Sequence, residues 1–256
     1  MEAKMLEGKV ALIVGASYGM GTAMAELFAA EGAKLVITAR GEDKLQEVVE
    51  KIRANGGEVV GVAADVTSAE DTEKVFKTVL DTYGTLDILL HNAGIGEQKM
   101  LDETDDDWMQ FVMDTNLKAP MRYTREALKI MLPKKSGSIV LVSSVNGTRP
   151  FCGATYTTTK GGLNTFVLNT AMRLVGSGIN INAIAPGATV TPAHLANKAG
   201  EQPGGNKLLE YTGHYVYFPG PECDPMDQAY GCLYLASKMG HAVTGQVLQI
   251  CNGAFL

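Results

Sequence analysis

Short apolar segments alternate along this chain with segments of helical length. The first, KVALIVG at 9–15, is too short for a helix and does not alternate with polar residues, so it predicts a strand buried on both faces. Strands separated by helical segments require crossover connections, which produce a parallel sheet covered on both sides. The pattern therefore predicts an α/β protein with a doubly wound parallel sheet of about seven strands. The other six predicted strands are 35–39, 59–65, 86–92, 137–144, 178–186 and 246–250.

Helices are expected over Gly21 to Glu31 and Asp43 to Ala54, and Ser68 is a candidate N-cap with Asp71 completing a capping box. A length of 256 residues suits one domain of this class, so we expect 1–256 to form a single domain. The one long irregular stretch, 189–224, follows the sixth strand. Ligands bind at the carboxyl ends of such strands, so 189–224 is predicted to be a substrate lid.

Composition excludes several classes of function. The net charge of −6 gives no general attraction for nucleic acid or an anionic membrane. The sequence has no apolar run of membrane-spanning length and no N-terminal apolar region of a secretory signal. The four cysteines are dispersed without metal-ligand spacing. We expect a cytoplasmic protein with no metal.

A glycine cluster, GASYGMG, lies between the first predicted strand and the first predicted helix. Gly15, Gly19 and Gly21 would allow a tight turn and a close approach of the backbone to a pyrophosphate. The helix that follows would supply N–H groups and a positive dipole end. The cluster predicts a Rossmann-type dinucleotide site, and a glycine-rich turn without a ligand is the alternative.

Tyr156 and Lys160 are four residues apart at the start of a predicted helix, so they share one helical face. A lysine beside a tyrosine disfavours the neutral phenol, and we therefore expect a lowered Tyr156 pKa suited to proton exchange near neutral pH. In an arbitrary sequence this spacing would be coincidence, but here a serine lies upstream at the end of the fifth strand.

The motif G-x-x-x-G-x-G, the sequence Asn92-Ala93-Gly94 and the Tyr156…Lys160 pair together resemble the short-chain dehydrogenases/reductases, and the resemblance extends from Gly8 to Gly253. It implies reversible hydride transfer between a nicotinamide cofactor and a secondary alcohol or ketone. Tyr156 would be the general acid or base, and Lys160 would lower its pKa and bind the cofactor ribose.

Two further catalytic residues follow from the resemblance. A serine would polarise the substrate oxygen: the family pattern Ser-x-x-Gly favours Ser144, whereas the distance to Tyr156 favours Ser143. Asn116 would hold a water of a proton relay, and its alternative role is to satisfy a backbone group. The predicted catalytic set is Asn116, Ser144, Tyr156 and Lys160.

The second strand ends at Ala39 and Arg40, where an NAD enzyme typically has an acidic residue. Arginine is a bidentate phosphate ligand, so NADP(H) is favoured and NAD(H) stays the alternative. Asp65 and Val66 would contact adenine, although Asp65 is equally suited to forming a turn. The predicted cofactor-binding residues are Gly15, Ser17, Tyr18, Gly19, Met20, Gly21, Arg40, Asp65, Val66, Asn92, Ala93, Gly94, Tyr156, Lys160, Pro186, Gly187, Thr189 and Thr191.

Aromatic and apolar residues are frequent in the predicted lid and before Tyr156, and they predict an apolar or ring-bearing substrate such as a hydroxysteroid, a bile acid or another alicyclic or aromatic ketone. The alternative is that these side chains only pack the lid or a subunit interface and do not contact the substrate. The residues are Phe151, Cys152, Leu208, Leu209, Tyr211, His214, Tyr215, Tyr217 and Phe218.

Two other functions are weighed against that prediction. A 3-oxoacyl-(acyl-carrier-protein) reductase would need basic residues for an acidic carrier, and Lys198 and Lys207 are few. A dinucleotide-binding sensor without turnover would tend to lose Tyr156 or Lys160, and both are present. The family resemblance also implies a homotetramer, with a homodimer as the alternative. His91 departs from the family pattern and is expected to be structural.

Overall fold

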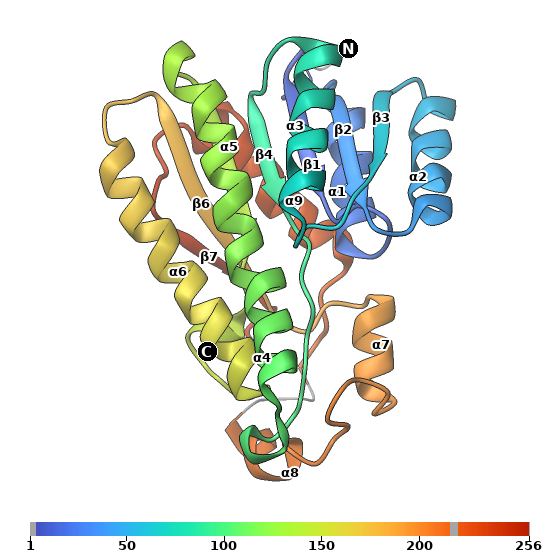
Figure 1. Cartoon of the computed structure of the whole chain (residues 1–256), viewed down its shortest axis with the longest axis vertical. Coiled ribbons are helices and arrows are strands. Elements are labelled where there is room, and N and C mark those ends of the chain that lie inside the picture. Colours follow the sequence, from blue (N-terminus) through green and yellow to red (C-terminus); the bar gives the residue numbers. More distant parts are fainter. Residues whose placement is uncertain (1–3, 216–219, 256) are drawn as a thin grey trace.

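The computed structural model describes residues 4–215 and 220–255 and contains one parallel sheet (Figure 1). The strand order is β3-β2-β1-β4-β5-β6-β7, so all seven predicted strands are confirmed, with ends that shift by no more than two residues. The strands are β1 Val10–Val14, β2 Lys34–Ala39, β3 Glu58–Ala63, β4 Ile88–His91, β5 Gly137–Val142, β6 Ile179–Pro186 and β7 Val247–Ile250.

Helices cover both faces of the sheet (Figure 1). Side chains of successive β1 residues point to opposite faces: Leu12 packs with α3, α5 and α6, whereas Ile13 packs with α1, α2 and α9. The helices are α1 Met20–Ala30, α2 Glu42–Ala54, α3 Ala69–Tyr83, α4 Asp106–Met113, α5 Ala119–Lys134, α6 Ala154–Leu174, α7 Pro192–Lys198, α8 Leu209–Thr212 and α9 Pro225–Ala236, with a π-helical turn at Asp114–Lys118. Among the described residues, none of the helices is long and apolar enough to cross a membrane.

The chain reverses its direction across the sheet at β1. It proceeds from β1 to β2 and β3 on one side, then returns to place β4 against the other side of β1. In open α/β sheets, the crevice at the carboxyl ends of the strands beside such a reversal is where ligands bind. The site is therefore expected beyond Val14 and His91.

The segment 189–224 is more regular than the sequence analysis predicted, because it contains α7 and α8. Thr191 caps α7 by accepting a hydrogen bond from the His194 amide at 3.1 Å, and Pro192 supplies a favoured first residue. Tyr217 and Phe218 lie outside the described residues.

The predicted capping box at α3 forms only in part. Ser68 accepts a hydrogen bond from the Asp71 amide at 3.1 Å, which confirms the N-cap. The Asp71 carboxylate, however, accepts from the backbone amide of Asp65 at 2.8 Å. It therefore fixes the turn after β3 and not the N-cap residue.

Candidate active site

The glycine cluster forms a turn that has no room for side chains. A Cβ atom on Gly15 would lie 2.7 Å from the backbone of Ala93, and one on Gly21 would lie 1.9 Å from the Gly15 carbonyl oxygen. Asn92 closes the turn from β4 by donating to that same oxygen at 2.7 Å. Packing of the turn against 92–94 thus brings two sequence-predicted segments together.

The first turn of α1 is open to an anion. Gly19 is its N-cap with a φ of 59°, and no side chain of the described residues caps the helix. The side chain of Thr191 lies directly across, since a Cβ on Gly19 would be 3.1 Å from the Thr191 methyl carbon. Ser17 is half-buried and Tyr18 is exposed. Uncapped helix N-termini supply free N–H groups, so this arrangement fits the phosphates of a dinucleotide.

Beyond β2, the buried Ala39 is followed by the exposed Arg40, which lies close to Asp65. Burial alone would raise the pKa of Asp65, but hydrogen bonds from Thr67 and the charge of Arg40 hold it below its ordinary value. The Asp65 carboxylate accepts from the amide and hydroxyl of Thr67 at 2.8 and 2.7 Å. Asp65 thus has the turn-forming contacts that were its alternative interpretation.

The start of α6 brings Tyr156 and Lys160 together beside the end of β5. The Lys160 ammonium lies 5.7 Å from the centroid of the Tyr156 ring and donates to the Val142 carbonyl at 2.9 Å. The Tyr156 phenol is hydrogen-bonded to Ser144. The Lys160 side chain is buried, and its closeness to the Tyr156 ring places the pair on one face of the helix, as the spacing predicts.

The predicted lowering of the Tyr156 pKa is wrong for this structure. Burial raises the pKa of Tyr156, Cys152 adds to the rise, and the hydrogen bond from Ser144 only partly opposes it. Burial also lowers the pKa of Lys160 to about 8. Desolvation is therefore the largest cause of the shift at both groups, and the phenol keeps its proton at neutral pH.

The two neighbouring serines have different partners. The Ser144 hydroxyl accepts from the Asn146 amide at 3.1 Å and faces Tyr156. The Ser143 hydroxyl instead donates to the Asn164 side chain at 2.6 Å, on α6. The structure therefore places Ser144, and not Ser143, beside the phenol.

Asn116 lies in the π-helical turn between α4 and α5 and is buried. Its side chain accepts from the Ile95 amide and donates to the Ile95 carbonyl, both at 2.8 Å. A Cβ on Gly94 would lie 3.2 Å from the Asn116 side-chain oxygen and 3.6 Å from the Lys160 nitrogen. Asn116 thus satisfies backbone groups, its alternative role, at a position next to Lys160.

A family model described as short chain dehydrogenase matches residues 9–202. The chain belongs to this family. The observed short-chain dehydrogenase fold, a seven-stranded parallel sheet between two layers of helices, agrees with that assignment.

Named relatives of this short-chain dehydrogenase include 3-oxoacyl-(acyl-carrier-protein) reductases. The one from Vibrio cholerae is 34% identical over 98% of this chain and 99% of its own. The one from Thermotoga maritima is 34% identical over 97% of this chain and 98% of its own. A variant of an actinorhodin polyketide ketoreductase, solved with NADPH, is 30% identical with a TM-score of 0.88 and 97% coverage of both chains. The protein is therefore an oxidoreductase that uses a nicotinamide dinucleotide.

The remaining residues predicted to contact the cofactor lie at and after the end of β6 in this short-chain dehydrogenase. Pro186 is the last residue of β6. The next residue, Gly187, packs against Cys251, because a Cβ on Gly187 would lie 2.5 Å from the Cys251 Cβ. The buried Thr189 accepts from Gln228 of α9 at 3.2 Å. The predicted cofactor-binding segments thus meet at one edge of the sheet, where Met20 and Val66 also lie. These segments are the first turn of α1, residues 92–94, α6 and residues 186–191.

Two residues near the site were missed or set aside by the sequence analysis. His91 is buried at the end of β4, with its ring edge-on to Tyr123 at 5.1 Å, and burial and then the charge of Lys160 lower its pKa to about 3. Glu97 is buried, and its carboxylate accepts from the Tyr156 amide at 3.1 Å. That contact joins residues 59 positions apart, and no local pattern could have indicated it.

Proposed function

We propose that the protein is an NADP(H)-dependent reductase of 3-oxoacyl thioesters, which converts the 3-oxo group to a 3-hydroxyl. One observation carries the proposal: Ser144, Tyr156 and Lys160 meet beside the glycine cluster in a chain that matches carrier-protein reductases over nearly its whole length. The cofactor, when bound, supplies the hydride. The protein supplies position, hydrogen bonds and the proton.

In this proposal Tyr156 donates its phenolic proton to the substrate carbonyl oxygen, and Ser144 donates a hydrogen bond to that oxygen. The raised pKa of Tyr156 agrees with this role, because the phenol keeps the proton that it would donate. Lys160 holds the cofactor ribose and returns a proton to the phenol. Asn116 fixes the backbone at Ile95 and thereby the wall beside Lys160.

The preference for NADP(H) rests on Arg40. Its exposed guanidinium follows β2, where the buried Ala39 takes the place that an acidic residue has in NAD enzymes. Arg40 would then pair with the 2′-phosphate. Arg40 also lies close to Asp65, the residue predicted to contact adenine. This supports a site in which the 2′-phosphate and the adenine bind near the same turn.

The docking of an acidic carrier finds little support in the predicted lid. Lys198 bonds to Glu222 at 3.0 Å, and Lys207 bonds to Glu103. Both cations are therefore paired with carboxylates of this chain. The thioester itself, and not the carrier, is therefore the substrate feature that we propose.

A ring-bearing ketone is the second candidate substrate, favoured by the likeness to the polyketide ketoreductase. The aromatic residues give it less support than the sequence suggested. Phe151 stacks on Phe255 with ring centroids 5.2 Å apart, and the Thr212 hydroxyl donates to the Phe151 carbonyl at 2.8 Å. Phe151 thus packs against the C-terminal tail and α8, which was the alternative interpretation for these side chains.

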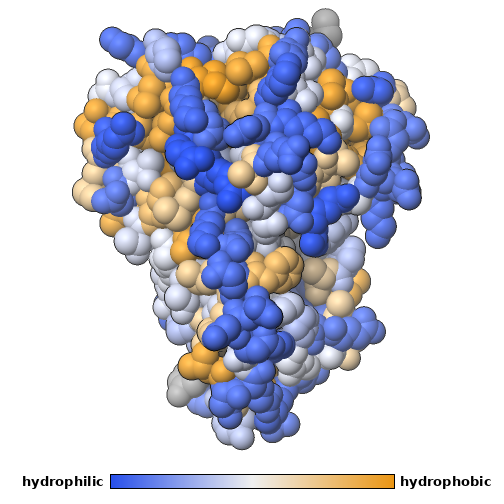
Figure 2. Space-filling view, viewed as in Figure 1, coloured by the Kyte–Doolittle hydropathy of each residue, from blue (hydrophilic) through white to orange (hydrophobic). Residues whose placement is uncertain are grey.

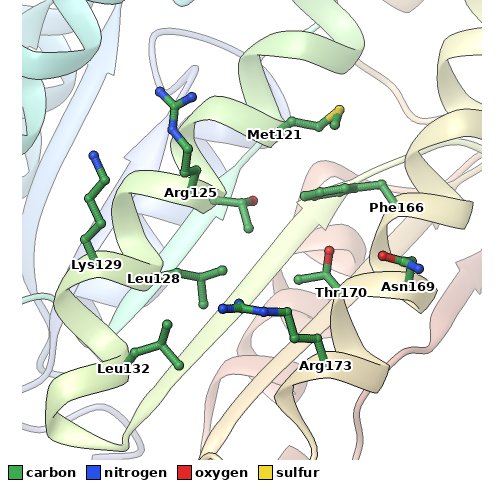
Figure 3. Close-up of a pocket in the computed structure, with 10 residues that line it drawn as sticks. Met121, Arg125, Leu128, Lys129, Leu132, Phe166, Asn169, Thr170 and Arg173 are labelled. Carbon is green, nitrogen blue, oxygen red and sulfur yellow. The ribbon is translucent and has the colours of Figure 1, made fainter.

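We also propose that a second copy of the chain covers the groove between α5 and α6 (Figure 3). Hydrophilic side chains form a band down this face of the molecule, with apolar side chains on both sides (Figure 2). The groove has a volume of about 350 Å³, and Phe166 and Arg173 of α6 extend across it toward α5 (Figure 3). Met121 of α5 lines the groove with Leu128 and Phe166 and is 41% exposed, which supports an apolar contact there.

The assembly is tested by light scattering after size-exclusion chromatography. Met121→Glu should reduce the oligomer to a smaller species, because it places a charge in the groove of the proposed interface. Leu195→Glu on α7 is the control, because the leucine is 54% exposed and lies outside the groove, and it should leave the assembly unchanged. A monomeric wild-type protein would contradict the proposal.

The activity is tested by absorbance at 340 nm with NADPH and NADH in parallel. A 3-oxoacyl thioester of a short carrier mimic, an alicyclic ring ketone and an aromatic ketone are compared. Turnover of the thioester with NADPH, abolished in Tyr156→Phe, is the expected result. Turnover of the ring ketones alone would replace the thioester proposal by the second candidate. Binding of cofactor without turnover of any ketone would indicate a dinucleotide-binding sensor.

A further inference from the structure

The first turn of α6, which carries Tyr156, is capped by a carboxylate from a distant segment. Gly153 is the N-cap residue and has no side chain to cap the helix. The Glu97 Oε1 atom accepts from the Tyr156 amide at 3.1 Å, which satisfies one of the N–H groups that a helix start leaves free. The other carboxylate oxygen accepts from the Lys99 amide at 2.9 Å. Glu97 is only 2% exposed, so water does not compete for these bonds.

Gly153 leaves the space that the Glu97 carboxylate occupies. A Cβ on Gly153 would lie 2.2 Å from Glu97 Oε1 and 2.4 Å from Oε2. The φ and ψ of Gly153, −54° and 148°, are open to any residue, so the close obstacle to a larger residue there is the Glu97 side chain and not backbone strain. The Gly153 amide also donates to the Glu97 carbonyl at 3.0 Å. The two residues therefore contact each other through both backbone and side chain.

Residues 97–99 also contact the segment predicted to be the lid. The Gln98 amide donates to the Pro203 carbonyl at 2.8 Å, and the Gln98 side chain donates to the Cys152 sulfur at 3.3 Å. Gly204 packs so closely that its Cβ would lie 2.3 Å from the Gln98 backbone. One short stretch thus joins 203–204 to the residues immediately before Tyr156.

We infer that Glu97 is a positioning residue for Tyr156: its buried carboxylate holds the first turn of α6 and fixes the phenol against Ser144, and residues 97–99 link that turn to 203–204. The inference rests on the proposed role of Tyr156 in ketone reduction. Glu97 makes none of its described contacts with the phenol itself. Glu97 acts on the phenol indirectly, through the backbone amide of Tyr156.

The first test is Glu97→Ala with steady-state kinetics. A displacement of about 1 Å at a reacting group costs as much as 100-fold in rate, so we expect kcat to fall 10- to 100-fold with little change in the KM for NADPH. Glu97→Gln keeps one acceptor oxygen and should restore most of kcat. Asp105→Ala is the matched control, because Asp105 also caps a helix with its carboxylate, accepting from the Trp108 amide at 2.7 Å. It should lower the melting temperature while kcat stays within a few-fold.

The second test is a double-mutant cycle between Glu97 and Gly153. Gly153→Ala alone should displace the carboxylate and reduce kcat as Glu97→Ala does. In the Glu97→Ala background the added methyl has room, so Gly153→Ala should then change kcat by less than about twofold. Additive losses in the double variant would overturn the inference, because they would show that the two residues act separately.

A readout independent of turnover separates this inference from the proposed function. Amide hydrogen exchange over 153–159 should accelerate in Glu97→Ala and not in Asp105→Ala. If the wild-type protein reduces no ketone, the proposed function fails while the exchange result still tests the cap. If the wild type is active and Glu97→Ala keeps both its kcat and its slow exchange, the inference is wrong.

Discussion

The side chain of Asn116 and the backbone of Ile95 form two reciprocal hydrogen bonds, each 2.8 Å long. The π-helical turn at Asp114–Lys118 places Asn116 in the space between α5 and the segment after β4. Ile95 therefore has its amide and carbonyl satisfied by one side chain, and the neighbouring Gly94 is fixed beside Lys160.

Replacing Asn116 by alanine should lower the free energy of unfolding by about 2 kcal/mol, because two backbone groups lose their partner. Urea unfolding followed by circular dichroism measures the change. Gln46→Ala, at an exposed position of α2, is the control and should shift the midpoint little. Equal midpoints for the two variants would show that the paired hydrogen bonds contribute nothing.

Ser144→Ala should reduce kcat about 100-fold, the cost of removing one hydrogen bond to a developing oxyanion. Ser143→Ala should instead leave kcat within a few-fold and cost about 1 kcal/mol of stability, since the Ser143 hydroxyl donates to the Asn164 side chain and the Lys160 carbonyl and not to the phenol. The kcat values of the two variants, measured at saturating cofactor, distinguish the roles of the two serines. A larger kcat loss in Ser143→Ala would reverse the assignment.

Arg40→Ala should raise the KM for NADPH roughly 10- to 100-fold, the expected effect of losing a charge-assisted bond to phosphate. The KM for NADH should stay the same, since NADH has no 2′-phosphate. Lys44→Ala, an exposed cation on α2, controls for a general loss of positive charge. If the two KM values rose together in Arg40→Ala, the NADP preference would have another cause.

Gly21→Ala should destabilise the protein by about 3 kcal/mol, since its methyl would meet the Gly15 carbonyl oxygen. Gly41→Ala is the matched control: no atom lies within 4 Å of its added Cβ, and its φ is −82°, so we expect a change below about 1 kcal/mol. Thermal unfolding compares both variants with the wild type. A wild-type melting temperature for Gly21→Ala would mean that the turn relaxes without cost.

His91 should make the protein sensitive to mild acid. Its folded pKa of about 3 lies below the unfolded value of about 6.5, so the unfolded state binds more protons between these values. Stability should therefore fall as the pH drops through this window, by about 2 kcal/mol between pH 7 and pH 5. His91→Asn should lose this part of the pH dependence, whereas His241→Asn, at an exposed histidine, should keep it. Parallel pH profiles for wild type and His91→Asn would contradict the prediction.

The fold could be predicted from the sequence because each buried strand has its own local pattern. The apolar run that became β1 and the N-cap at Ser68 depend on neighbouring residues alone. The helices of the 189–224 segment are harder to predict from the sequence, because α7 and α8 are too short to give a periodic pattern.

The site was predictable only where its residues belong to compact motifs. Tyr156 and Lys160 are one turn apart, whereas Glu97 reaches Tyr156 from another part of the chain. The pKa of Tyr156 was predicted with the wrong sign because it depends on burial, which the chain creates only when it folds. The choice between Ser143 and Ser144 likewise required the direction of two side chains.

The position of β1 in the sheet has a consequence for synthesis on the ribosome. β2 can pair with β1 as soon as residue 39 has emerged, but the other neighbour of β1 is β4, which ends at His91. While the intervening residues are being added, β1 has one paired edge and one open apolar edge. Such edges are where chains join one another, so between these two points of its synthesis the nascent protein is open to aggregation through β1.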